Sequence, residues 1–312
     1  MHLSNRQSAY NINNGLSAIV ADIKRFAVHD GDGIRTTVFL KGCYLRCKWC
    51  HNPEGLMIEP QLAYYSHKCI DCGFCVKACP NGAHSMKDGT HYYDRGKCLS
   101  CGLCESVCPT DALKLYGHVM SVDQLIPILL EDRRFYENTG GGVTLSGGDP
   151  LCQPEFCVEL FRRLKKENIN TALDTSGFAS REVLDKILPY TDMFLYDIKA
   201  YNEDVHKFCT GVKNRGILDN LKYLDERGCT IKIRIPYVPK MNDDQIKEIG
   251  AFISNLGNAH EVKILPYHAY SNSKYEALGM KYPIPDIPMP DNEMIEQAKE
   301  SLNYALGSKT VR

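Results

Sequence analysis

The sequence has almost no net charge and no long apolar segment. Its 37 basic side chains nearly balance 38 acidic ones, for a net charge of −1, so no general attraction to nucleic acid or to a membrane surface is implied. It contains no run of about 18 apolar residues, the length typical of a membrane-spanning helix. The first 15 residues are polar and lack an apolar core, so we expect no secretory signal there.

Tryptophan is also scarce, whereas cysteine is abundant. Trp49 is the only tryptophan, and it adjoins a cysteine, where it could shield a metal site or simply pack. There are 15 cysteines in 312 residues, and eleven of them fall into metal-ligand spacings. In a chain of this size without a secretory signal, that pattern indicates a cytoplasmic metalloprotein rather than a disulfide framework.

The first cysteine group follows the apolar run at residues 37–40. Cys43, Cys47 and Cys50 form a C-x3-C-x2-C pattern. Three thiolates can bind three irons of a [4Fe–4S] cluster, whereas a structural cluster usually has four cysteine ligands. The fourth iron is then open to a small molecule, as is the open position of a catalytic zinc. A zinc knuckle with a distant fourth ligand is the alternative that this spacing allows.

A second cysteine system repeats one pattern twice between residues 69 and 109. Each copy reads C-x2-C-x2-C-x3-C-P, the run of bacterial ferredoxins, in which the fourth cysteine binds the other cluster. One predicted [4Fe–4S] site therefore has the ligands Cys69, Cys72, Cys75 and Cys108. The other has the ligands Cys98, Cys101, Cys104 and Cys79. Two zinc sites are the alternative, although zinc ligands occur more often as separated C-x2-C pairs.

The rest of the chain alternates between strand-like and helix-like segments. Strands are predicted at 19–23, 36–40, 143–145, 170–174, 193–198, 230–237 and 261–265. Helices are predicted at 122–136, 155–166, 181–188, 214–227, 243–256 and 292–306. The proline-rich residues 282–290 are predicted to form an extended surface link. Strands that alternate with helices of this length favour βα units around a parallel sheet.

Polar motifs follow five successive predicted strands. They lie at residues 146–150, 174–177, 197–199, 234 and 266–268. In parallel α/β folds the chemistry gathers at the carboxyl ends of the strands. A single polar residue at such a place is usually a cap, but five in succession favour a lined pocket.

The chain resembles, over nearly its whole length, the activating enzymes of glycyl radical enzymes, which belong to the radical S-adenosylmethionine (SAM) superfamily. The residues that carry this resemblance are 29–35, 43–54, 146–150, 197–199 and 265–268. The double cysteine run that follows the first group resembles the insert found in the subgroup of these enzymes that has auxiliary clusters.

The resemblance implies an α/β fold, namely a partial (β/α)6 TIM-like barrel with an inserted 2[4Fe–4S] ferredoxin-like domain. The barrel is expected to start at residues 16–59, which include the SAM-cluster loop. The insert is expected at residues 60–116. Residues 117–312 are expected to complete the barrel and to end in a C-terminal helix.

The resemblance also implies the reaction. SAM is cleaved reductively to methionine and a 5′-deoxyadenosyl radical, which abstracts a hydrogen atom from a glycine of a partner glycyl radical enzyme of the dehydratase or lyase type. The cofactors implied are SAM, one SAM-binding [4Fe–4S] cluster and two auxiliary ones. A flavodoxin or ferredoxin is the expected reductant, in the cytoplasm of an anaerobic cell. Residues 274–283 are most similar to activators of small-polyol, choline or sulfonate eliminases.

Individual site residues are carried over from the family motifs. The SAM amino group is expected to meet Gly147, Gly148 and Asp149, where the family more often has Glu at the last position. The SAM carboxylate and ribose are expected near Lys199, Arg234 and His268. Positive donors suit an anionic carboxylate. No catalytic side chain is expected beyond the SAM cluster.

Three acidic residues are assigned by the same motifs. Asp30 lies in the loop expected to contact the glycyl-loop peptide of the partner. Asp174 and Asp197 match positions associated with a monovalent cation, although either can instead orient a neighbouring side chain.

Two other functions stay open on the residues alone. The first is a radical SAM enzyme that acts on another peptide or on a small molecule, although peptide-modifying members usually carry their auxiliary clusters after the barrel. The second is a ferredoxin-type electron carrier, which leaves the first cysteine group and the strand-end pocket without a role. The remaining cysteines are interpreted as small core or surface thiols and not as metal ligands; they are Cys152, Cys157, Cys209 and Cys229.

Overall fold

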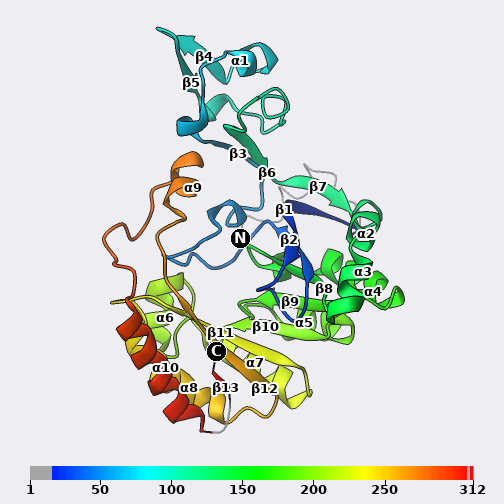
Figure 1. Cartoon of the computed structure of the whole chain (residues 1–312), viewed down its shortest axis with the longest axis vertical. Helices are drawn as coiled ribbons and strands as arrows, with labels where there is room; N and C mark the ends of the chain where they lie inside the picture. The colour runs from blue at the N-terminus through cyan, green and yellow to red at the C-terminus, as the bar shows by residue number, and fades with distance from the viewer. Residues whose placement is uncertain (1–15, 308–309, 312) are drawn as a thin grey trace.

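The centre of the protein is a mostly parallel sheet (Figure 1), seen in a computed structural model that describes residues 16–307 and 310–311. The polar segment 1–15 lies outside the described residues. Within them the sheet has nine strands, in the order β13-β12-β11-β10-β9-β8-β2-β1-β7. From β13 to β2 in this order each strand is parallel to its neighbour, whereas β1 is antiparallel to both of its neighbours, β2 and β7. In chain order the strands are β1 (Ser17–Ala27), β2 (Arg35–Leu40), β7 (His118–Ser121), β8 (Gly142–Gly147), β9 (Asn170–Thr175), β10 (Met193–Asp197), β11 (Ile231–Tyr237), β12 (Ala259–Pro266) and β13 (Thr310–Val311).

Side-chain alternation along the strands separates the core from the other face of the sheet. In β11 the side chains of Ile231, Ile233 and Ile235 are buried in the main apolar core. Successive strand side chains point to opposite faces. Arg234 therefore points away from this core, on the face where the functional cavity lies.

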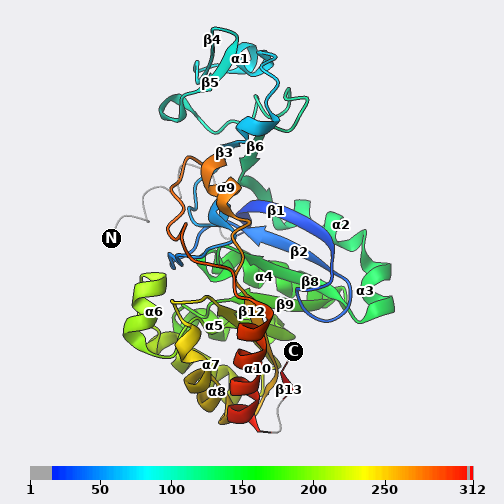
Figure 2. The same cartoon turned by 60° about the vertical axis from the view of Figure 1, so that its left-hand side comes forward.

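Helices supply the other half of that core. The helices that contribute to it are α2 (Val122–Leu130), α3 (Arg133–Thr139), α4 (Pro154–Lys166), α5 (Arg181–Ile187), α7 (Arg215–Glu226), α8 (Ile246–Ser254) and α10 (Asn292–Leu306). Helices α6 (Glu203–Thr210) and α9 (Asn272–Ala277) pack in smaller apolar clusters instead. In α4, Phe156, Leu160 and Leu164 recur at helical spacing and are fully buried. Figure 2 shows α8 and α10 side by side, with α10 next to β12. In the described part of the chain, none of the helices has the length and apolar character needed to cross a bilayer.

The segment between β3 (Gln61–Tyr64) and β6 (Leu113–Tyr116) folds outside the large sheet. It contains α1 (Phe74–Ala78) and the hairpin β4 (His84–Lys87) and β5 (Thr90–Tyr93). It projects from one end of the molecule, beside α9 (Figures 1 and 2). A small apolar cluster of Ala63, Tyr116, Ala277 and Leu278 joins its base to α9.

Two predictions about local structure are wrong. The single helix over residues 122–136 is two helices, α2 and α3, because the chain turns at Asp132, whose carboxylate accepts hydrogen bonds from Thr36 Oγ1 (2.7 Å) and Arg25 Nε (2.8 Å). Residues 282–290 do lack helix and strand, but they are not simply a surface link. The Tyr282 and Ile284 side chains are buried, and the Tyr282 hydroxyl lies 2.6 Å from that of Tyr267.

Candidate functional site

A cavity of about 280 Å³ lies at the carboxyl ends of the parallel strands. This volume is close to the lower end of the range for small-molecule sites. Strands β2, β8, β9, β10, β11 and β12 each contribute to its wall, through Phe39, Ser146, Asp174, Asp197, Arg234 and Leu265 respectively. The strand-end pocket that the polar motifs predict is therefore confirmed.

The loop after β2 carries three cysteines into this cavity. Cys43, Cys47 and Cys50 all line it, and among the described residues they are the only cysteines that do. The loop is held from α6, because Arg46 N donates to Thr210 O (2.7 Å) and Lys48 N donates to Cys209 O (2.9 Å). Burial raises the pKa of each thiol, that of Cys50 to about 12. Unliganded, these thiols are protonated, whereas an iron site would bind them as thiolates. Three converging sulfur donors with no fourth on the wall suit a cluster with one open iron.

A network of ion pairs forms another part of the wall. Arg234 Nε donates to Asp197 Oδ1 (3.0 Å), and its Nη2 donates to Asp174. Lys199 Nζ donates to Asp197 Oδ2 (2.9 Å), and Ser146 Oγ donates to Asp174 Oδ2 (2.6 Å). All five of these side chains line the cavity. The expected monovalent cation would have to compete with Arg234, because Arg234 already pairs with both carboxylates.

The charges of this network follow from burial and pairing. Burial raises the pKa of Asp174 to about 6, even though Arg234 opposes the shift. Burial acts in the same direction on Asp197, but Arg234 and Lys199 outweigh it and hold the Asp197 pKa below its usual value. Burial would lower the pKa of Lys199, but Asp197 and Cys47 raise it overall. The wall therefore presents two fixed cations and one firmly ionised carboxylate near pH 7.

The backbone of the turn after β8 packs directly against the backbone of neighbouring segments. Gly147 has φ +118°, and a Cβ there would lie 2.3 Å from the backbone N and O of Leu40. A Cβ on Gly148 would lie 2.2 Å from Gly42 O and 2.3 Å from Gly55 O, on either side of the cysteine loop. Both glycines line the cavity. Only glycine allows so close an approach, so this turn sets the distance between the β8 end and the cysteine loop.

Two of the predicted cofactor-binding side chains lie off the described cavity wall. The Asp149 carboxylate is buried and accepts hydrogen bonds from Ser176 Oγ (2.6 Å), Ser176 N (3.0 Å), Thr175 Oγ1 (2.9 Å) and Leu151 N (3.1 Å). It ties the β8 and β9 turns together. His268 stacks on the His51 ring, with centroids 3.9 Å apart. The residues directly before them, Gly148 and Tyr267, line the cavity, but Asp149 and His268 do not.

Asp30 lines the cavity, and its contact with a partner peptide stays a prediction. Its Oδ2 accepts a hydrogen bond from Thr37 Oγ1 (2.7 Å), and its carbonyl accepts one from Thr144 Oγ1 (2.7 Å). The fully buried Arg35 donates to the same Thr144 hydroxyl (2.7 Å). The loop before β2 is thus fixed to β8.

Contacts between residues far apart in the chain also shape the site, and no motif marks them. Lys274 Nζ, on α9, donates to Glu54 Oε1 (2.6 Å) and His51 O (3.2 Å), just after Cys50. Arg95 Nη2 donates to Ala277 O (2.5 Å) at the other end of α9. Helix α9 therefore connects the projecting segment with the cysteine loop. Trp49 packs in an apolar cluster with Tyr267 and also lines the cavity, so its packing role is confirmed and its shielding of a metal site stays a prediction.

The other eight patterned cysteines gather in two hollows of the projecting segment. One hollow is lined by Cys69, Cys72, Cys75 and Cys108. The other is lined by Cys79, Cys98, Cys101 and Cys104. Each hollow thus takes three cysteines from one run and the fourth from the other run, the same grouping as in the ferredoxin pattern. Gly73 and Gly102 occupy equivalent places in the two loops, with φ +73° and +78°.

Comparison with known proteins agrees with this geometry. The family model of the Radical SAM superfamily matches residues 37–253. The choline trimethylamine-lyase activating enzyme of Oleidesulfovibrio alaskensis is 40% identical over 290 residues, which cover 90% of this chain and 94% of the relative. The chain belongs to the radical SAM superfamily, as one of its activating enzymes. The predicted membership among activating enzymes of glycyl radical enzymes is confirmed, and an electron carrier without catalytic function is set aside.

Two further similarities extend the comparison. The (2S)-3-sulfopropanediol sulfolyase activating enzyme of Bilophila wadsworthia is 42% identical over 273 residues, which cover 85% of this chain and 90% of the relative. A crystal structure of a domain of pyruvate-formate lyase-activating enzyme from Bacteroides vulgatus is 29% identical. It covers 55% of this chain and 99% of that domain, with a TM-score of 0.46.

Proposed function

We propose that this activating enzyme binds SAM in the strand-end cavity, cleaves it reductively, and leaves a radical on a glycine of a partner glycyl radical enzyme. The overall reaction consumes SAM and one electron, and it yields methionine, 5′-deoxyadenosine and the glycyl radical. A [4Fe–4S] cluster on Cys43, Cys47 and Cys50 would supply that electron. The observation that carries the proposal is the convergence of these cysteines, two cations and a glycine turn on one cavity.

The side chains of the wall have distinct roles in this proposal. Lys199 and Arg234 present positive donors to the SAM carboxylate, and their pairing with Asp197 fixes their direction before SAM arrives. Gly147 and Gly148 let the SAM amino group approach the backbone. Asp149 and His268 act as positioning residues, since Asp149 holds the Thr175–Ser176 turn and His268 supports His51.

Water must be kept from so reactive a site. Trp49, Val238 and Tyr267 form an apolar part of the wall and are buried. In our proposal the glycyl-loop peptide completes the closure when it enters past Asp30. The carboxylate of Asp30 would then meet the backbone N–H groups of the peptide.

We propose further that residues 60–116 form a ferredoxin-like domain with two auxiliary [4Fe–4S] clusters, between the barrel segments 16–59 and 117–312. The grouping of cysteines in the two hollows supports it, because four sulfurs in each complete a cluster's ligand shell. A flavodoxin or ferredoxin of the cytoplasm would be the electron donor. The partner's own substrate stays open, because relatives at 40% and 42% identity are named for different partners.

A SAM-dependent change in the EPR spectrum tests the cavity assignment. After anaerobic reconstitution with iron and sulfide and reduction with dithionite, we expect SAM to alter the signal of one [4Fe–4S]1+ cluster and to leave the others unchanged. The altered signal should be absent from Cys43→Ala but present in Cys157→Ala, which removes a buried thiol that lies off the cavity wall. A spectrum that is identical with and without SAM would contradict the proposal.

A further inference from the structure

The β4–β5 hairpin places two buried histidines between the two cysteine hollows. His84 pairs across the hairpin with Tyr93, and His91 lies two residues before Tyr93 on the same face. The two imidazole rings are therefore neighbours, with centroids 5.0 Å apart and planes 28° apart. His91 lines the hollow of Cys69, Cys72, Cys75 and Cys108, whereas His84 lines the other hollow.

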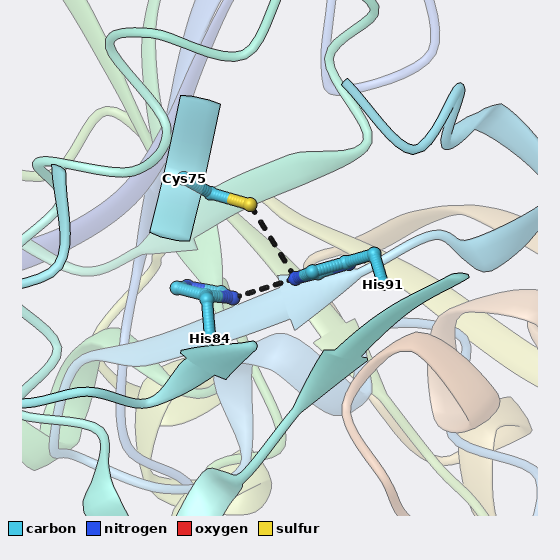
Figure 3. Close-up of side chains that lie close together, drawn as sticks. All are labelled: Cys75, His84 and His91. Atoms are coloured by element: carbon cyan, nitrogen blue, oxygen red, sulfur yellow. Dashed lines mark hydrogen bonds between the residues drawn. The ribbon is translucent and has the colours of Figure 1, made fainter. Parts of the chain in front are cut away.

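The hydrogen-bond contacts of His91 link this pair to cysteine sulfur (Figure 3). His91 Nε2 lies 3.4 Å from Cys75 Sγ and 2.9 Å from His84 Nδ1. His91 Nδ1 lies 3.8 Å from Cys69 Sγ. If Nε2 carries the proton, it faces the Cys75 sulfur and the His84 nitrogen. If Nδ1 carries it, it faces the Cys69 sulfur, and Nε2 accepts a hydrogen bond from His84. In both tautomers one N–H of His91 faces a sulfur of the same hollow.

We propose that His84 and His91 form an imidazole bridge between the two auxiliary cluster sites, and that His91 raises the reduction potential of the cluster held by Cys69, Cys72, Cys75 and Cys108. This inference rests on the proposed function, since it requires the auxiliary clusters. Hydrogen bonds to cluster sulfurs favour the reduced state, because its extra negative charge strengthens the bond. An electron that reaches the pair of clusters then resides preferentially on this one.

The same side chains could instead bind a single metal ion. Ligand atoms of Cys75, His84 and His91 all lie within 4.8 Å of one another, and mixed Cys and His ligands are typical of zinc. Cys75 cannot be a ligand of both this ion and the cluster, because it also lies with three other cysteines in one hollow. We favour the cluster, since it accounts for all four cysteines, and the zinc ion becomes an outcome of the test.

The test uses the full chain with Cys43, Cys47 and Cys50 all changed to Ala, so that only the auxiliary clusters contribute. Redox titration is followed by EPR in this parent and with His91→Leu, His91→Gln or Tyr92→Phe added. We expect His91→Leu to lower the reduced-to-oxidised ratio of one cluster about tenfold at fixed potential, which is about 59 mV for one electron. His91→Gln retains an N–H donor and should stay near the parent. Tyr92 is exposed on the other face of β5, so Tyr92→Phe should match the parent.

A second measurement applies even if His91→Leu fails to load iron. With nitrogen-15-labelled histidine in the parent, ENDOR of the reduced protein should show a histidine nitrogen coupled to one cluster. Two loaded clusters with unchanged potentials in His91→Leu, or no histidine coupling, would overturn the inference and leave the auxiliary clusters in place. One zinc per chain that is lost in His91→Leu would also overturn it. A parent that binds no iron–sulfur cluster would refute the auxiliary clusters themselves.

Discussion

Cys47→Ala is expected to abolish SAM cleavage. Cys47 is the middle ligand of the loop after β2, and it lines the cavity near the ammonium of Lys199. Its loss leaves two sulfur donors on the wall, which cannot hold a [4Fe–4S] cluster with three protein ligands. The measurement is 5′-deoxyadenosine formed by the dithionite-reduced, reconstituted protein, and we expect it to fall to the level of protein without iron.

The control for this prediction is Cys229→Ala. Cys229 lies outside the cavity and outside both auxiliary hollows, and it packs at the margin of the main core. We expect this variant to form 5′-deoxyadenosine at the wild-type rate. Cleavage by Cys47→Ala at a comparable rate would mean that the loop cysteines do not bind the reactive cluster.

Gly148→Ala is expected to weaken SAM binding and destabilise the fold by a purely steric route. The added Cβ would lie 2.2 Å from Gly42 O and 2.3 Å from Gly55 O, and backbone atoms cannot move aside as a side chain can. The turn after β8 must then shift away from the cysteine loop. Overpacking of this kind costs about 1–3 kcal/mol of folding stability. We also expect SAM affinity to fall by at least a factor of about ten. A loss of about 1.4 kcal/mol of binding free energy corresponds to that factor.

Stability and SAM affinity are measured separately, by urea denaturation and by the SAM dependence of the EPR signal. Gly216→Ala is the matched control, because a Cβ there meets nothing within 4 Å and the residue lies inside α7. Alanine favours a helix over glycine, so this control should be neutral or slightly stabilising. Unchanged SAM affinity in Gly148→Ala would show that the turn does not contact SAM.

Much of this site could be predicted from the sequence because its chemistry is local in the chain. Cysteine spacing alone yields the two groups of four, and the structure brings the same residues together in two hollows. Polar residues at strand ends converge because parallel strands end at one edge. Asp174, Asp197, Lys199 and Arg234 were found in this way, and all four line the cavity.

Contacts that depend on packing between distant segments could not be predicted. The Asp149 carboxylate accepts hydrogen bonds from Thr175 and Ser176 in the turn after β9, and no sequence motif predicts this contact. The contact between Lys274 and Glu54 joins residues 220 positions apart. The break in the helix predicted at 122–136 has the same origin, because Asp132 is held by Thr36 and Arg25 on other strands.

Transfer of hydrogen from a partner glycine tests the activase account most directly. The reduced wild-type protein and SAM are mixed with a glycyl radical enzyme labelled with α-deuterated glycine, first the choline trimethylamine-lyase and sulfolyase types for which its relatives are named. We predict deuterium in 5′-deoxyadenosine together with a glycyl radical EPR signal on the partner. Rapid formation of unlabelled 5′-deoxyadenosine with no radical on any partner, and modification of another peptide or a small molecule instead, would contradict it.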